Sequence, residues 1–141
     1  AKGRLAAIIV LDQFSRNMYR DRPEAFAQDK LALDWCLEGL EDNIDLQLEP
    51  IERVFFYLPL EHSEDLQMQD LSCRKFAELL KCSSSTQTAQ ARGTYEDFSR
   101  YAERHREVIQ QFGRFPHRNK ILGRASTALE QQYLDTPGSG F

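Results

Sequence analysis

The hydrophobic residues of this 141-residue chain recur every three or four positions, which is the spacing of amphipathic α-helices. No segment shows the apolar and polar alternation of a β-hairpin. The sequence therefore predicts an all-α fold, an antiparallel helix bundle or tetratricopeptide-like superhelix of about five long helices and one or two short ones. The predicted helices cover residues 4–20, 21–40, 50–60, 64–82 and 95–113, with short segments at 119–122 and 127–134.

The first predicted helix has two faces, an apolar stripe and a second face that runs through Leu5, Ile8, Asp12 and Tyr19, and we expect the helix to be buried on more than one side. The pair Asp12 and Arg16 lies one turn apart on one face, either as a simple ion pair, which we favour because such pairs are common, or as part of a polar site. The other face is apolar and is expected to pack on the core. It consists of Ala7, Val10, Leu11, Phe14 and Met18.

Local signals mark the beginnings of two further helices. Asp21 has the sequence context of an N-cap, with Pro23 and Glu24 in the first turn of the second helix. Thr127 and Glu130 have the spacing of a capping box for the last short helix. Each signal predicts where its helix begins.

Two other segments are distinguished by their apolar content. Residues 50–60 are apolar on nearly every face, which predicts a helix at the centre of the core. The stretch Ser83–Thr94 is poor in apolar residues and predicts a mobile, functionally quiet loop.

Several polar residues occupy positions where a core residue is expected. Asp29 and Gln69 interrupt apolar stripes, and a buried carboxylate such as Asp29 needs a positive partner from Arg16 or the basic residues near the C-terminus. His105 stands on the apolar face of the fifth helix, where a leucine is expected. A histidine in such a position most often has a structural role. His62 is left unexplained by the helix capping that accounts for its neighbours.

Positive charge is concentrated in the stretch Phe112–Arg124, whose sequence is F-G-R-F-P-H-R-N-K-I-L-G-R. This stretch has no carboxylate, whereas the whole chain has a net charge of −4. Such a positive segment in an acidic protein holds either the protein's own carboxylates or an anionic ligand. The acidic total argues against nucleic-acid binding.

Composition limits the setting in which the protein works. The length fits one all-helical domain over residues 1–141, and we expect an N-terminal segment of the full domain to be missing. The three cysteines form no C-x-x-C pair and their number is odd, which favours reduced thiols in the cytoplasm. The longest apolar run is Leu5–Leu11, too short for a membrane helix, so no membrane partner is expected.

Four stretches of the chain resemble the bacterial domain-of-unknown-function family 924. They are Leu11–Asn17, Leu58–Leu66 followed by Gln69, Tyr101–Arg106 and Phe112–Thr127. The resemblance extends from one end of the chain to the other and implies a tetratricopeptide-like helical fold with a longer N-terminus. The family brings no established activity, cofactor or catalytic residue, so the resemblance implies a fold and no function.

Two hypotheses account for the polar residues that we expect to converge between helices. One is a pocket for a small anionic molecule, in a binding protein or an enzyme, with arginines holding a carboxylate or phosphate and a histidine transferring protons. The other, slightly favoured, is a scaffold for an unknown protein partner, in which the same residues form a buried ion-pair network. The candidate site residues are Asp12, Arg16, Asn17, His62, Glu64, Gln69, His105, Arg114, His117, Arg118, Asn119 and Arg124.

A metal site is the third alternative. His62, Glu64, His105 and His117 match no helical spacing of metal ligands, and nearby arginines oppose a cation. The sequence therefore predicts neither a metal nor a cofactor, and the residues alone assign no reaction.

Overall fold

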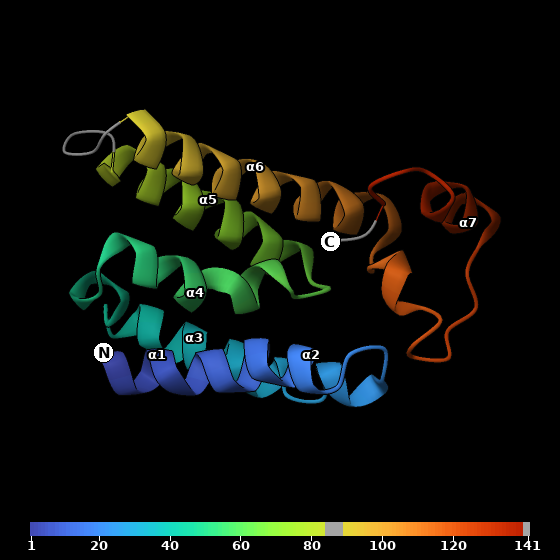
Figure 1. The fold of residues 1–141 in the computed structure, drawn as a ribbon, viewed down its shortest axis with the longest axis horizontal. Coiled ribbons are helices and arrows are strands. Elements are labelled where there is room, and N and C mark those ends of the chain that lie inside the picture. Colours follow the sequence, from blue (N-terminus) through green and yellow to red (C-terminus); the bar gives the residue numbers. More distant parts are fainter. Residues whose placement is uncertain (84–88, 140–141) are drawn as a thin grey trace.

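The computed structural model describes residues 1–83 and 89–139, and within these ranges every regular element is a helix. This confirms the all-α prediction, and no helix there has the length and apolar character needed to cross a membrane. Short turns of π- or 3₁₀-helix occur at Val10–Phe14, Pro23–Phe26, Asp45–Gln47 and Pro116–Arg118. The α-helices are α1 (Lys2–Ile9), α2 (Ser15–Met18), α3 (Asp29–Glu41), α4 (Pro50–Glu61), α5 (Leu66–Ser83), α6 (Ala89–Phe112) and α7 (Ala128–Leu134) (Figure 1).

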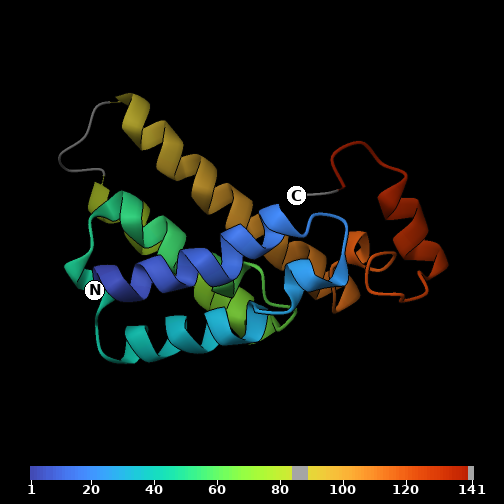
Figure 2. The same cartoon turned by 60° about the horizontal axis from the view of Figure 1, so that its bottom comes forward.

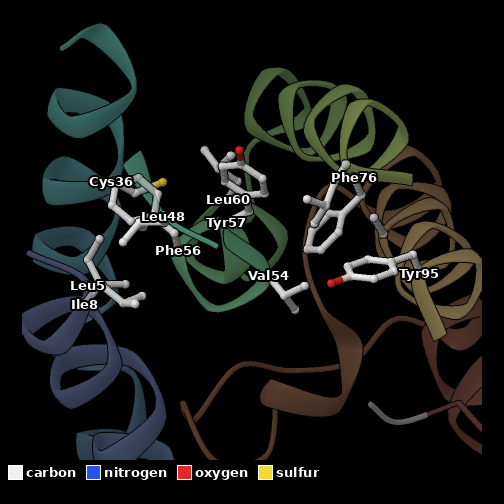
Figure 3. Close-up of a cluster of buried hydrophobic side chains, with 12 residues drawn as sticks. Leu5, Ile8, Cys36, Leu48, Val54, Phe56, Tyr57, Leu60, Phe76 and Tyr95 are labelled. Carbon is white, nitrogen blue, oxygen red and sulfur yellow. The ribbon is translucent and has the colours of Figure 1, made fainter. Parts of the chain in front are cut away.

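Helix α4 lies at the centre of the core, between α1 and α3 on one side and α5 and α6 on the other (Figure 3). Phe56 is fully buried toward the first pair of helices, while Val54 and Tyr57 lie toward Phe76 of α5 and Tyr95 of α6. The ring of Tyr57 meets that of Phe76 edge to face, with centroids 5.9 Å apart. An apolar helix is needed here because it packs on both sides, and each large side chain buried contributes about 1.5–3 kcal/mol.

Helices α5 and α6 run antiparallel along one side of the molecule (Figure 1). The predicted loop at 83–94 is wrong for residues 89–94, which already belong to α6. Residues 84–88 of that loop lie outside the described part of the chain. Propensity explains the early start of α6, since Ala89, Gln90, Ala91 and Arg92 are favourable helix formers despite their low apolar content.

Of the two faces of the first helix that were expected to be buried, only one is. The face carrying Leu5, Ile8 and Asp12 is buried, as expected, whereas the apolar stripe is wrong, because Val10, Phe14 and Met18 are 52, 53 and 70% exposed. The π-turn at Val10–Phe14 adds a residue to the helical turn and shifts the register of the positions that follow it. The most regular hydrophobic spacing therefore lies on the exposed side of this helix, and the buried side is partly polar.

The predicted beginning of the second helix is also wrong. Asp21 has a φ angle of 62° and lies in a turn, Pro23–Phe26 forms only a 3₁₀-turn, and α3 begins at Asp29. Asp21 lies in the left-handed region, which Asp tolerates better than most residues and which an N-cap does not use. The resulting turn lies beside the C-terminal segment at one end of the molecule (Figure 2).

The C-terminal segment crosses that end after α6. Gly113, with a φ angle of 68°, ends α6 in the left-handed conformation that glycine adopts without strain. A 3₁₀-turn at Pro116–Arg118 leads into the expected turn at 119–122, in which the Leu122 N–H donates to the Arg118 carbonyl at 2.9 Å, and Gly123 follows with a φ angle of 65°. Thr127 and Glu130 form the predicted capping box at the beginning of α7.

Candidate functional site

Asp12 is held deep between the helices by the π-turn that interrupts the first helix. Its side chain is 1% exposed, and one carboxylate oxygen lies 2.7 Å from Nδ1 of His62 and 3.0 Å from the Arg16 guanidinium. His62 follows the last turn of α4, so this contact joins residues 50 positions apart. Short π-turns are frequent at functional sites because they redirect a side chain without ending the helix.

The protonation states of this pair follow from its surroundings. Burial raises the pKa of Asp12, but its contacts with His62 and Arg16 outweigh that effect and lower the pKa to about 2. Burial lowers the pKa of His62 despite the attraction of Asp12. A neutral His62 donates Nδ1–H to the Asp12 carboxylate, which fixes the tautomer and leaves Nε2 as the basic nitrogen.

A second carboxylate, Asp29 at the beginning of α3, joins two arginines. Arg16 donates two hydrogen bonds to it, at 2.6 and 2.9 Å. Arg118 reaches the same carboxylate only at 3.4 Å. The charge of Asp29 is therefore committed mainly to Arg16, and Arg118 is less completely neutralised.

Arg118 is buried between two aromatic rings. Its guanidinium lies 4.8 Å from the ring centre of Phe26 and 4.5 Å from that of Phe115, and it donates a hydrogen bond to the His62 carbonyl at 2.9 Å. Its Nε is buried and has no acceptor among the residues the structure describes. Burial, followed by the charge of Arg16, lowers the pKa of Arg118 to about 10, so it stays cationic at neutral pH.

These groups surround a cavity of about 230 Å³, which we call the histidine cavity. The chain has three histidines, and all of them line it. Asp21 is the one carboxylate among its described lining residues. The nitrogen-bearing side chains around it are Arg16, Arg20, His62, His105, His117 and Arg118.

Basic side chains outnumber acidic ones in the described lining of the histidine cavity, although Arg16 is paired with Asp12 and Asp29. Burial lowers the pKa of His105 to about 3 and that of His117 to about 4, and the charge of Arg118 contributes to both shifts. Neutral imidazoles beside cationic guanidiniums favour an anion, because an anion stabilises both groups.

A larger cavity of about 390 Å³ adjoins the first and shares His62, Phe26 and Arg118 with it. Its lining is more acidic and includes Asp29 and Glu64. Within residues 1–83 and 89–139, no three His, Cys, Asp or Glu side chains are grouped closely enough to hold a metal ion. The chemistry that this region supports is hydrogen bonding and proton transfer.

Four other residues hold the C-terminal segment in place, and we call them the brace: Glu64, Arg114, Arg124 and Glu130. Arg124 donates to both oxygens of Glu64, at 2.6 and 2.9 Å, and Arg114 does the same to Glu130, at 2.6 and 2.8 Å. Glu64 also accepts a hydrogen bond from the Phe115 backbone at 2.7 Å. Hydrogen bonds from Arg114 and the Thr127 backbone lower the pKa of Glu130 to about 2, as expected for a fully paired carboxylate.

The twelve predicted site residues thus separate into groups. Asn119 supports the brace through Arg124, and Gln69 donates to the Glu61 and Ser63 carbonyls, which fixes the turn between α4 and α5. Asn17 is exposed and lines neither cavity. The residues that line the histidine cavity or orient a histidine there are Asp12, Arg16, His62, His105, His117 and Arg118.

Five residues that line the histidine cavity are absent from the sequence prediction: Arg20, Asp21, Ala25, Phe26 and Ile121. Arg20 and Asp21 line it from the turn after α2, and Phe26 stacks on Arg118. The charged run Arg20–Asp21–Arg22 is a signal in the sequence, but the context of Asp21 predicts the beginning of a helix. Phe26 gave no signal because an aromatic residue in an apolar pattern indicates core packing.

Comparisons with known proteins agree on the family. A family model described as bacterial protein of unknown function (DUF924) matches residues 1–138. A solved structure of a protein of unknown function from Agrobacterium tumefaciens is 36% identical, with a TM-score of 0.77. The match covers 94% of this chain and 66% of that one, so this chain spans less than two thirds of its length. No curated protein matches the sequence.

Proposed function

Because the chain belongs to a bacterial family of unknown function, its role must be argued from its own site, and we propose that it binds a small anionic molecule in the histidine cavity. The observation that carries the proposal is the lining of that cavity by three arginines and all three histidines of the chain, against one carboxylate, Asp21, among the lining residues that the structure describes. A carboxylate or phosphate group on the ligand supplies the missing negative charge.

Arg118 is the residue that we assign to recognition of the anion. Its ion pair with Asp29 is long, at 3.4 Å, because Arg16 holds that carboxylate at 2.6 Å. The aromatic rings on both faces of Arg118 fix the plane of the guanidinium, which suits planar, bidentate binding of a carboxylate or phosphate.

His62 is the residue that we assign to proton transfer. Asp12 accepts its Nδ1–H at 2.7 Å, so Nε2 is available as a general base toward a bound molecule or a water. This arrangement makes the protein an enzyme that removes a proton next to an anionic group of its substrate. The odd number of cysteines and the absence of a C-x-x-C pair support a place in the cytoplasm for this activity.

A scaffold that binds another protein is the second candidate. The paired charges of the brace favour it, since Arg114 and Arg124 are each satisfied by a carboxylate of the chain itself. If the whole basic stretch serves this purpose, Arg118 is also structural, and its loss reduces stability without changing the affinity for any anion.

Calorimetric titration with inorganic phosphate and with small mono- and dicarboxylates separates the two candidates. The variant Arg118→Gln should weaken binding at least about tenfold, the effect of losing one charge-assisted hydrogen bond. Arg114→Gln is the matched control, because Arg114 lines neither cavity and should lose stability with unchanged affinity. Equal affinity in wild type and Arg118→Gln, or no heat with any anion, contradicts the proposal and favours the scaffold.

A further inference from the structure

A second site of opposite character lies in a groove along α4, α5 and α6. Its volume is about 290 Å³, and its walls are almost entirely apolar. Aromatic rings dominate the lining and come from all three helices: Phe55 from α4, Phe76 from α5, and Phe98 and Tyr101 from α6. Glu61 is the only charged residue among the described residues that line it.

Glu61 is an unusual residue for such a groove. It is 5% exposed, and its carboxylate accepts no hydrogen bond from the described part of the chain. The nearest titratable side chain is that of His105, which is neutral at pH 7; its Nδ1 lies 3.4 Å from the carboxylate but closer to the Tyr101 carbonyl, at 2.9 Å. Burying a carboxyl group costs free energy unless a hydrogen-bond donor or a cation compensates for the lost water. A ligand that supplies such a group would therefore stabilise Glu61 in this apolar wall.

We propose that this groove binds a small primary ammonium compound with an apolar body, whose cationic head lies at Glu61 and whose body lies against the aromatic rings. A carboxylate combined with aromatic faces is the combination that recognises an ammonium ion, since both attract a cation. No Lys or Arg is found among the described lining residues, so an anion finds no counter-charge there. The inference is independent of the anion proposed for the histidine cavity.

The proton balance of binding is defined by the groups that face Glu61. Burial and then the charge of Asp12 raise the pKa of Glu61 to about 8, so the free groove holds a neutral acid at pH 7. The ammonium ion binds as a cation and Glu61 releases one proton to solvent, which leaves the pair with no net charge. The neighbours Asp12 and His105 have pKa values of about 2 and about 3, and the pKa of Cys73 is raised by burial, so none of them changes charge between pH 5 and 8. His62, next in sequence, has a pKa lowered by burial.

Hexylamine is a suitable probe, with hexanol and hexanoate as neutral and anionic controls of the same length. In calorimetric titrations of the whole chain, the dissociation constant of hexylamine should fall about tenfold for each pH unit from 6 to 8, because one proton is released on binding. Hexanol should bind more weakly and without this dependence on pH. Hexanoate should be excluded at pH 8.

The variant Glu61→Gln tests the assignment of the residue. It should weaken hexylamine binding at pH 8 at least tenfold, whereas Glu78→Gln, which removes an equal charge from an exposed position on α5, should leave it unchanged. The pH dependence of the wild type provides the same test should Glu61→Gln fold poorly. Hexylamine binding that matches hexanol in strength and is independent of pH overturns the proposal.

Discussion

Arg114 and Arg118 lie four residues apart in the same basic stretch, but their surroundings differ in kind. Arg114 belongs to the brace and donates two short hydrogen bonds to Glu130. Arg118 lies between two aromatic rings at the wall of the histidine cavity and reaches Asp29 at only 3.4 Å. One arginine is satisfied by its own chain, and the other retains capacity for a ligand.

The difference shows that some residues of one positive segment stabilise the fold while others are placed to bind a ligand. The brace uses the carboxylates Glu64 and Glu130 to hold the C-terminal segment against the end of the helices. That segment in turn carries His117 and Arg118 to the cavity. The brace is therefore the support for the site and not part of it, and the two regions should respond differently to mutation.

The largest effect is expected for Glu64→Gln, which disrupts the brace. The change removes both ionic hydrogen bonds to Arg124 and weakens the one from the Phe115 backbone. Losing these charge-assisted hydrogen bonds from a partly buried pair should reduce the free energy of unfolding by roughly 3 kcal/mol, measured by urea denaturation. The exposed Glu78→Gln should change it by less than about 0.5 kcal/mol. A loss below 1 kcal/mol for Glu64→Gln contradicts the role of the brace.

The next largest effect is expected for Glu61→Gln, which should stabilise the protein. The pKa of Glu61 is raised in the folded chain to about 8 from an ordinary value of 4.5, so the contribution of this one group to stability is greatest below pH 4.5 and falls as the pH rises toward 8. Glu61→Gln removes this dependence and should make the protein more stable than wild type by about 3 kcal/mol at pH 7. Urea denaturation at pH 4.5 and 7 measures it. Equal stability of the two proteins at pH 7 contradicts the buried, protonated carboxyl.

Acid should destabilise the protein through its histidines. The pKa values of the histidines are lowered in the folded chain. Their contribution to the free energy of unfolding is therefore fully present above pH 6.5 and is lost as the pH falls below that value. His105→Gln removes one such group and should recover about 2 kcal/mol of the loss between pH 6.5 and 5. Comparing both proteins in a Glu61→Gln background isolates the histidine. An unchanged pH profile rules out a buried, neutral His105.

The smallest effect is expected on the exposed face of the first helix. Phe14 is 53% exposed, so Phe14→Ser should change the free energy of unfolding by no more than about 0.5 kcal/mol. Ile8 is fully buried, and Ile8→Ala should cost about 2–5 kcal/mol. Thermal and urea unfolding of both variants measure the contrast, and a larger loss for Phe14→Ser than for Ile8→Ala reverses the assignment of the two faces.

The sequence predicted those features that depend on local signals. The apolar run of α4 and the capping box of Thr127 each identify a structure formed by residues close together in the chain. The apolar stripe of the first helix was wrongly expected to be buried, because the face that is buried instead includes Asp12, whose burial depends on a partner far along the chain.

The sequence could name candidate residues for the site, but it could not predict which of them lie together in space. His62 was a candidate because helix capping did not account for it, and His105 because it stands where a core leucine is expected, although a structural role was favoured for it; both line the histidine cavity. Which arginines belong to the brace and which line the histidine cavity was not predictable, since this depends on whether a carboxylate from another segment lies within reach. Glu61 was overlooked because it ends an apolar helix, where a charged residue is usually exposed.

Nitrogen NMR of the three imidazoles tests the central claim most directly, because every histidine of the chain lines the proposed anion site. At pH 7, His62 should be neutral and protonated on Nδ1. Inorganic phosphate should raise the pKa of the cavity histidines in the wild type and in Arg114→Gln, but not in Arg118→Gln. Three imidazoles that titrate near pH 6.5 and do not respond to phosphate would contradict an anion site in this cavity.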